Sequence, residues 1–236
     1  MELTTDQIIF WEWGVVRITA TLVYTWVVMV VLVSGSWLIS RKLQSDIQMN
    51  RWQNFLEVLV SMIKDQIREA SQQNPNHYLP FIGTLFLFIL ALNVLDIFPG
   101  ISAPTTSLST TAALASCVFI AVPIFGIARQ GAKEYFAHYM RPSPIMLPFN
   151  IIGELSRTIA LAIRLFGNMM SGSLIVAILL SLAPLFFPVL VQAFGLLIGV
   201  IQAYVFSILA LVYIASGQRA HETDESSLST EIKKDE

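Results

Sequence analysis

The longest uncharged stretch of the chain constrains its fold more than any other feature. No residue from Leu165 to Gln218 carries a charge, and this run is more than twice the ~20 apolar residues with which a helix crosses a bilayer core of ~30 Å. Pro184 and Pro188 lie inside the run, where proline ends one helix and allows the next to begin. The stretch predicts a helical hairpin in a membrane, with arms at residues 146–183 and 189–216.

Both arms are longer than an upright membrane helix. At a rise of 1.5 Å per residue, the first arm measures ~57 Å and the second ~42 Å. Helices of this length in a slab ~30 Å thick must tilt steeply or lie partly flat. We therefore expect a long and steeply tilted hairpin.

Three further apolar segments predict additional crossings, at residues 18–40, 79–98 and 108–128. The chain of 236 residues is 55% hydrophobic and 13% charged, whereas soluble domains carry about 25% charged residues. This composition excludes a soluble enzyme and a nucleic-acid-binding protein. It predicts one all-α integral membrane domain, residues 1–236, with about five transmembrane helices.

The segments outside the spans have their own patterns. Residues 50–73 gather apolar side chains on one helical face, which predicts an amphipathic helix that lies on the membrane surface or packs against a partner subunit. Residues 1–17 form an N-terminal segment, and residues 219–236 are charged and rich in Ser and Thr, which predicts a disordered tail. Lys and Arg gather between spans one and two, between spans three and four, and in the tail, with Arg17 opposite them. The positive-inside rule then places the N-terminus outside and the C-terminus in the cytoplasm.

Arg164 is the residue that most needs an explanation, because it stands at the midpoint of the first arm of the hairpin. A guanidinium keeps its proton at any accessible pH, and a fixed cation at mid-bilayer costs several kcal/mol or more. Such a residue normally has a partner. Glu154 lies ~15 Å along the helix axis and is turned by ~80°, and it is better placed to pair with Arg157 at i, i+3. We therefore expect another chain to supply the carboxylate that faces Arg164.

Polar groups converge near Arg164. Asn168 lies one turn later on the same face, and Gln202 stands at the midpoint of the facing arm. Small residues at 167 and 171–173 would let another helix come close. The alternative is an arginine that snorkels or caps backbone carbonyls without any role in transport.

The run from Glu154 to Met169, ELSRTIALAIRLFGNM, followed by the Ile201–Phe206 segment IQAYVF, resembles subunit a of rotary F-type ATP synthases. The segment from Asn93 to Pro99, NVLDIFP, resembles the N-x-x-D-x-x-P motif of that family, and the PTTSLSTT segment that begins at Pro104 has a counterpart there. The segments SLSTTAALA and MSGSLIV are similar to the alternate, N-type branch of the family.

The resemblance implies a subunit of the membrane (Fo) sector, with two offset half-channels that carry ions to and from the carboxylates of a ring of c subunits. Arg164 would be the stator arginine that faces those carboxylates, Gln202 and Asn168 its polar neighbours, and Asp96 a channel-mouth acid or simply the end of span two. The other implied partners are the peripheral-stalk subunit b, the F1 sector and the lipid bilayer. The resemblance implies no cofactor, no nucleotide site and no catalysis in this chain. It places the protein in the inner membrane of a bacterium, with a thylakoid membrane as the alternative.

The chain departs from the common pattern of the family at titratable positions. Serine stands at 107 and 173, where many members have an acid or a histidine. Together with Ser171, these hydroxyls would hold water or a partly hydrated Na⁺ with neutral oxygens. The transported ion is expected to be H⁺, with Na⁺ as the alternative. The complete set of candidate ion-translocation residues is Arg164, Gln202, Asn168, Asp96, Asn93, Glu154, Arg157, Ser171, Ser173 and Ser107.

Other functions compatible with a buried arginine are a secondary transporter, a quinone-linked membrane subunit and a passive anchor. A secondary transporter of common type would show an inverted repeat, and none is evident in the sequence. A quinone site would need a His or an acid near an aromatic pocket, whereas His77, His138 and His221 fall in predicted loops or the tail. A passive anchor would tolerate the loss of Arg164.

Overall fold

The computed structural model describes residues 9–13, 16–41, 51–71, 74–97, 103–131, 133, 135, 146–182 and 187–232. Helices dominate these residues: α1 (Ala20–Ser40), α2 (Arg51–Ser71), α3 (Leu79–Val94), α4 (Leu108–Gln130), α6 (Met146–Leu182) and α7 (Phe187–Ile232). Short 3-10 helices, η2 (Pro75–His77), η3 (Leu95–Ile97) and η4 (Pro104–Thr106), flank α3 and precede α4.

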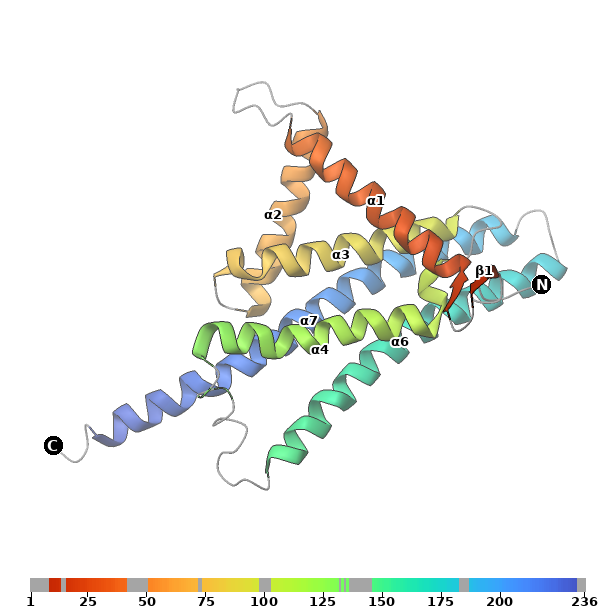
Figure 1. The fold of residues 1–236 in the computed structure, drawn as a ribbon. Helices are drawn as coiled ribbons and strands as arrows, with labels where there is room; N and C mark the ends of the chain where they lie inside the picture. The colour runs from red at the N-terminus through yellow and green to blue at the C-terminus, as the bar shows by residue number, and fades with distance from the viewer. Residues whose placement is uncertain are drawn as a thin grey trace.

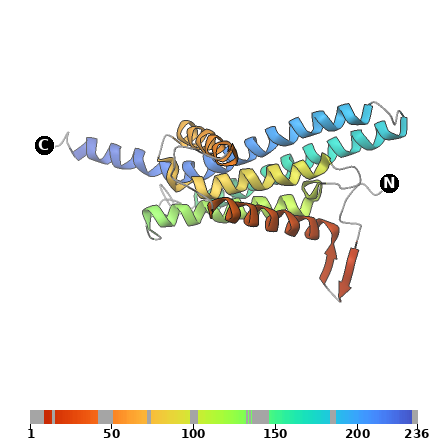
Figure 2. The ribbon, with the colours of Figure 1, turned by 90° about the horizontal axis from the view of Figure 1, so that it is seen from above.

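The long helices run back and forth along one direction. In Figure 1, α3, α4, α6 and α7 lie side by side and alternate in direction, and the two termini lie at opposite ends of the molecule. Helix α1 runs diagonally away from α3, and α2 returns toward the start of α3. The view from above shows the same alignment, with the N-terminal strands projecting to one side (Figure 2). Alternating direction is what successive membrane crossings require.

The helices confirm the all-α membrane class predicted from the sequence. Among the described residues, four helices are long and apolar enough to cross a membrane, and these segments are Ala20–Leu38, Leu108–Ala128, Leu147–Leu179 and Leu190–Ser216. The apolar helix α3 is shorter, with 16 residues. Helices α1, α4 and α6 begin and end within two residues of the predicted spans, whereas α3 ends at Val94 and α7 continues to Ile232. The predicted turn at Pro184 falls outside the described residues.

Two terminal segments differ from the predictions. Residues 9–13 and 16–19 form antiparallel strands, β1 (Ile9–Trp13) and β2 (Val16–Thr19), and the first span begins at Ala20. The β-branched and aromatic residues of this segment favour strands. Helix α7 continues to Ile232, past residue 219 where the charged tail was predicted to begin, and the disorder of that tail stays a prediction. A helix that has already formed extends at little cost, since each added residue gains a hydrogen bond without a new nucleus.

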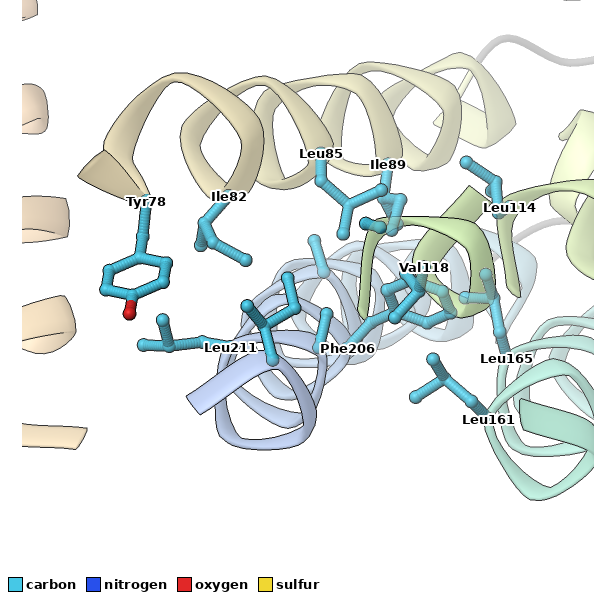
Figure 3. Packing of buried hydrophobic residues seen from close by; sticks show 14 of the residues in the cluster. Tyr78, Ile82, Leu85, Ile89, Leu114, Val118, Leu161, Leu165, Phe206 and Leu211 are labelled. Carbon is cyan, nitrogen blue, oxygen red and sulfur yellow. The ribbon is translucent and has the colours of Figure 1, made fainter. Parts of the chain in front are cut away.

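The buried core lies where α3, α4, α6 and α7 meet. Figure 3 shows apolar side chains from these four helices pointing into one cluster, including Ile89 of α3, Val118 of α4, Leu165 of α6 and Phe206 of α7. Among these, Ile89, Leu165 and Phe206 are fully buried. In lipid, such helices associate mainly through close packing, because the surrounding tails are as apolar as the core.

Hydroxyl groups on the apolar helices bond to their own backbone. Thr84 donates to the Pro80 carbonyl, Ser116 to Ala112 and Ser207 to Ala203, each four residues earlier. This bond satisfies a hydroxyl where no water is available. Isolated Ser and Thr residues therefore do not interrupt the predicted spans.

The amphipathic helix predicted at 50–73 is present as α2, and part of its apolar face packs against the chain itself. Ile67 is fully buried and Ile63 packs against the core cluster. The Tyr204 hydroxyl of α7 donates a hydrogen bond to Gln66 of α2. The C-terminal half of α2 thus contacts other helices of the same chain, which neither predicted role, a helix on the membrane surface or a contact with a partner subunit, accounts for.

Candidate functional site

Arg164 is the middle residue of the 37-residue helix α6. Its side chain is exposed, although its neighbour Leu165 is fully buried in the core. The apolar residue Ile163 beside it is 56% exposed. The guanidinium therefore lies at the edge of an outward apolar face, which the described residues leave uncovered.

No acidic side chain within the described residues forms an ion pair with Arg164, and no hydrogen bond is formed by its guanidinium there. That its counter-charge comes from another chain stays a prediction. An uncompensated cation within an apolar span is unstable in lipid. The position therefore favours an external anionic group.

Asn168 and Gln202 meet across the hairpin, as predicted from their depths. The Asn168 Nδ2 atom of α6 donates to Gln202 Oε1 of α7 at 2.7 Å. Gln202 is 5% exposed, whereas Asn168 is exposed on the same side of α6 as Arg164. The bond joins the two arms one helical turn from Arg164.

This arrangement can attract and release a carboxylate. A permanent cation favours the ionised form of an acid that enters its neighbourhood, whereas an acid that faces lipid is stable only when neutral. The Asn168 and Gln202 amides supply additional donors and acceptors at the same depth. The geometry at Arg164 suits the fixed half of such a pair.

The small residues after Arg164 divide between two faces of α6. Gly167 and Ser171 are exposed, while Gly172 and Ser173 are half-buried. The Ser171 hydroxyl donates to the Asn168 carbonyl at 3.1 Å, and the Ser173 hydroxyl donates to the Met169 carbonyl at 3.1 Å. Each of these serines retains lone pairs that can accept a hydrogen bond.

A second polar group lies nearer the N-terminal end of α6. The Arg157 Cζ atom lies 5.9 Å from the centroid of the Tyr213 ring, within cation–π range. Glu154, Arg157, Thr158 and Tyr213 line a cavity of about 20 Å³ together with apolar residues of α4. A cavity of this size holds about one water molecule. The predicted Glu154–Arg157 ion pair stays a prediction.

A third polar group lies at the C-terminal end of α3. Asn93, 3% exposed, donates through Nδ2 to the Gly199 carbonyl at 2.9 Å and accepts from the Thr105 hydroxyl at 2.8 Å. These bonds join α3, α7 and η4. Sequence reasoning selected Asn93 but missed Thr105 and Gly199, because the contact with Gly199 spans 106 positions.

Asp96 follows α3 and lies outside this helix, in η3. Its Oδ1 atom accepts a hydrogen bond from the Ala103 backbone N–H at 3.2 Å, which links η3 to the residue that precedes η4. Ser107 is buried beyond η4 and shares a hydrogen bond with Ser109, the two oxygens being 2.7 Å apart.

The ten predicted residues thus fall into three groups along the bundle. Arg164, Asn168, Gln202 and Ser171 lie together at the middle of the hairpin, and Ser173 follows on another face of α6. Glu154 and Arg157 lie nearer the start of α6. Asn93, Asp96 and Ser107 lie at the end of α3 and the start of α4. Tyr213 was missed, since an aromatic residue in an apolar helix carries no signal of a polar contact.

Together, fold and site define a polytopic helical membrane protein with a fixed cation exposed on the middle of a long hairpin. The chain belongs to the family described as ATP synthase A chain, whose sequence model matches residues 22–215. ATP synthase subunit a 1 of Crocosphaera subtropica is 59% identical over 222 residues, which cover 94% of this chain and 96% of that protein. ATP synthase subunit a 2 of Acaryochloris marina is 57% identical over 98% of this chain and 97% of its own length. ATP synthase subunit a 1 of Chlorobaculum parvum is 55% identical over 96% of this chain and 100% of its own length.

Proposed function

We propose that this chain is the ion-translocating stator subunit of an F-type ATP synthase, in which Arg164 faces the carboxylates of a rotating ring of c subunits. The observation that carries the proposal is the exposure of Arg164 at the middle of α6, without an ion pair among the described residues. The ring supplies the missing anion, one c subunit after another.

Arg164 acts by electrostatics rather than by chemistry. A ring carboxylate that reaches Arg164 gives up its ion because the cation lowers its pKa, and it must bind an ion again before it moves back into lipid. A guanidinium held between the two exchange points also repels the transported cation and prevents direct leakage. Ion flow is thereby coupled to rotation.

The two polar groups on either side of Arg164 are suited to two offset half-channels. Asp96 and Ser107 belong to one path, near the end of α3, with Asn93 packed beside them. Glu154 and Arg157, with Tyr213 and their water-sized cavity, belong to the other. Asn168, Gln202, Ser171 and Ser173 surround the exchange region.

The partners follow from the same scheme. The exposed face of α6 meets the c ring, the peripheral-stalk subunit b holds this chain still, and nucleotide chemistry belongs to the F1 sector. The chain itself has no catalytic role. The chain lies in a bacterial inner membrane, with a thylakoid membrane as the alternative. Its N-terminus faces the outside and its C-terminus faces the cytoplasm.

We take H⁺ as the transported ion, with Na⁺ as the alternative that the serine-rich positions suggest. The ring carboxylate and its neighbours decide between the two ions, and they belong to another chain. A secondary transporter or a quinone-linked subunit does not fit the family to which the chain belongs.

The proposal is tested by asking which surface meets the ring. A photoreactive amino acid at position 163, on the exposed face of α6, is expected to cross-link to the c subunit in membrane vesicles. The control position is Val31, which is 61% exposed on α1. In Figure 1, α1 runs diagonally away from the bundle that contains α6. Cross-linking to c from position 31 but not from position 163 would overturn the proposed orientation.

A further inference from the structure

Asn93 joins three segments of the interior through both ends of its amide. It is 3% exposed, its Nδ2 atom lies 2.9 Å from the Gly199 carbonyl oxygen, and its Oδ1 atom lies 2.8 Å from the Thr105 hydroxyl. Thr105 is itself fully buried in η4. An amide held at both ends is restrained from rotating to follow a passing ion.

Gly199 permits this contact because it has no side chain. A Cβ atom at this position would lie 3.0 Å from the Asn93 Cβ atom and 3.5 Å from its Cγ and Nδ2 atoms. At this separation the neighbouring atoms must move by a few tenths of an ångström, and because Asn93 and Gly199 are both buried, the shift falls on packed helices. A larger residue at 199 would therefore push α7 away from α3.

The contact lies close to the Arg164 site along α7. Gly199 precedes Gln202 by three residues, or ~4.5 Å along the helix axis. Gln202 in turn accepts the bond from Asn168, one turn after Arg164. The η4 segment that carries Thr105 also packs against α6. A shift of α7 at Gly199 is thus transmitted directly to the Gln202–Asn168 pair.

We infer that Asn93, held by Thr105 and packed on Gly199, is a positioning residue that sets the register of α7 so that Gln202 meets Asn168 beside Arg164. The effect on ion translocation rests on the proposed function, whereas the effect on register does not. The two are therefore measured separately.

Register is measured by thiol cross-linking in membrane vesicles that contain the assembled complex. Exposed Cys117 is first replaced by serine. Cysteines are then placed at positions 168 and 202, where the native Asn168 Nδ2 and Gln202 Oε1 atoms are 2.7 Å apart. A short bifunctional thiol reagent is expected to join α6 and α7. Adding Gly199→Ala should lower the yield several-fold.

The matched control is Gly83→Ala on α3, a buried helical position at which the nearest atom to an added Cβ is 4.0 Å away. This control is expected to leave the yield unchanged. An equal yield with and without Gly199→Ala would overturn the inference, whatever the activity of the complex. If the Gly199→Ala complex fails to assemble, Thr105→Val provides the same comparison with a milder change.

Function is measured with residues 168, 202 and 117 left native. Thr105→Ser keeps the hydroxyl that holds Asn93 and should retain most ion-driven ATP synthesis, whereas Thr105→Val should lose it about in parallel with the cross-linking yield. A loss of synthesis with Thr105→Val at full cross-linking yield would contradict positioning. A lowered yield with normal synthesis would leave the register effect standing and count against the proposed role of the Gln202–Asn168 pair.

Discussion

Replacing Gln202 with leucine is expected to slow ion-driven ATP synthesis without preventing assembly. Leucine places an apolar side chain in the buried position and removes the oxygen that accepts the 2.7 Å hydrogen bond from Asn168. The Asn168 amide then has no partner on α7, at the depth where the ring carboxylate meets Arg164.

The magnitude follows from the state of the donor that remains. The net loss of a hydrogen bond costs ~1 kcal/mol, and a donor left unsatisfied in apolar surroundings costs up to ~3 kcal/mol. If this cost falls on the ion-exchange step, the rate drops by about 5-fold to about 150-fold. Lipid around the ring favours the upper part of this range, because it offers Asn168 no replacement partner.

The assay is the initial rate of ATP synthesis in vesicles with an imposed ion gradient, normalised to the amount of assembled complex. Gln192→Leu is the matched control, because Gln192 lies on the same helix and its side chain makes no hydrogen bond within the described residues. The control should retain near-normal synthesis, which would separate loss of the Gln202 contact from a general effect of leucine.

A double-mutant cycle with Asn168→Leu tests the hydrogen bond itself. If the bond matters, the double variant should be no slower than the slower single variant, with a coupling free energy of ~1 kcal/mol or more. Strictly additive losses would refute a role for the bond. An unchanged rate for Gln202→Leu would reduce Gln202 to a packing role.

Three further outcomes are expected. Gly126→Ala should destabilise the chain by ~1–3 kcal/mol, because a Cβ atom there would lie 2.5 Å from the Tyr135 ring. Thermal inactivation of the solubilised complex measures the loss of stability, with Gly83→Ala as the control. Equal inactivation temperatures for the two variants would contradict the expected clash. Tyr213→Phe should retain ATP-driven pumping because it keeps the aromatic ring beside Arg157. Tyr213→Leu should lose a contact of ~0.5–1 kcal/mol and pump several-fold more slowly. Equal pumping rates for the two variants would count against the cation–π contact. If the ion is H⁺, added Na⁺ at constant pH should neither change ATPase activity nor protect the ring carboxylate from carbodiimide, and protection would establish Na⁺ instead.

The hairpin and its arginine were predictable because both follow from the cost of placing charge in lipid. A long uncharged run can fold only as helices that satisfy their own backbone, and a charge within it must have a reason. The pairing of Asn168 with Gln202 followed from equal depth on facing arms. These predictions need only helix geometry and the thickness of a bilayer.

The contacts between distant segments were not predictable in the same way. The fit of Asn93 against Gly199 depends on how closely α3 and α7 approach, which no local pattern reports. The continuation of α7 past residue 219 was not predicted, because composition describes an isolated segment, whereas here a helix precedes it. The strands at residues 9–19 are likewise too short to stand out beside the spans.

The most direct test of the central claim is ion-driven ATP synthesis by the complex that carries Arg164→Ala, compared with the wild type at equal assembly. A stator cation that faces the ring predicts complete loss of coupled synthesis while the c subunits remain associated with this chain. Arg164→Lys, which keeps a charge but not the planar guanidinium, serves as the conservative comparison. Normal coupled synthesis by Arg164→Ala would contradict the claim that this cation holds the ring carboxylates.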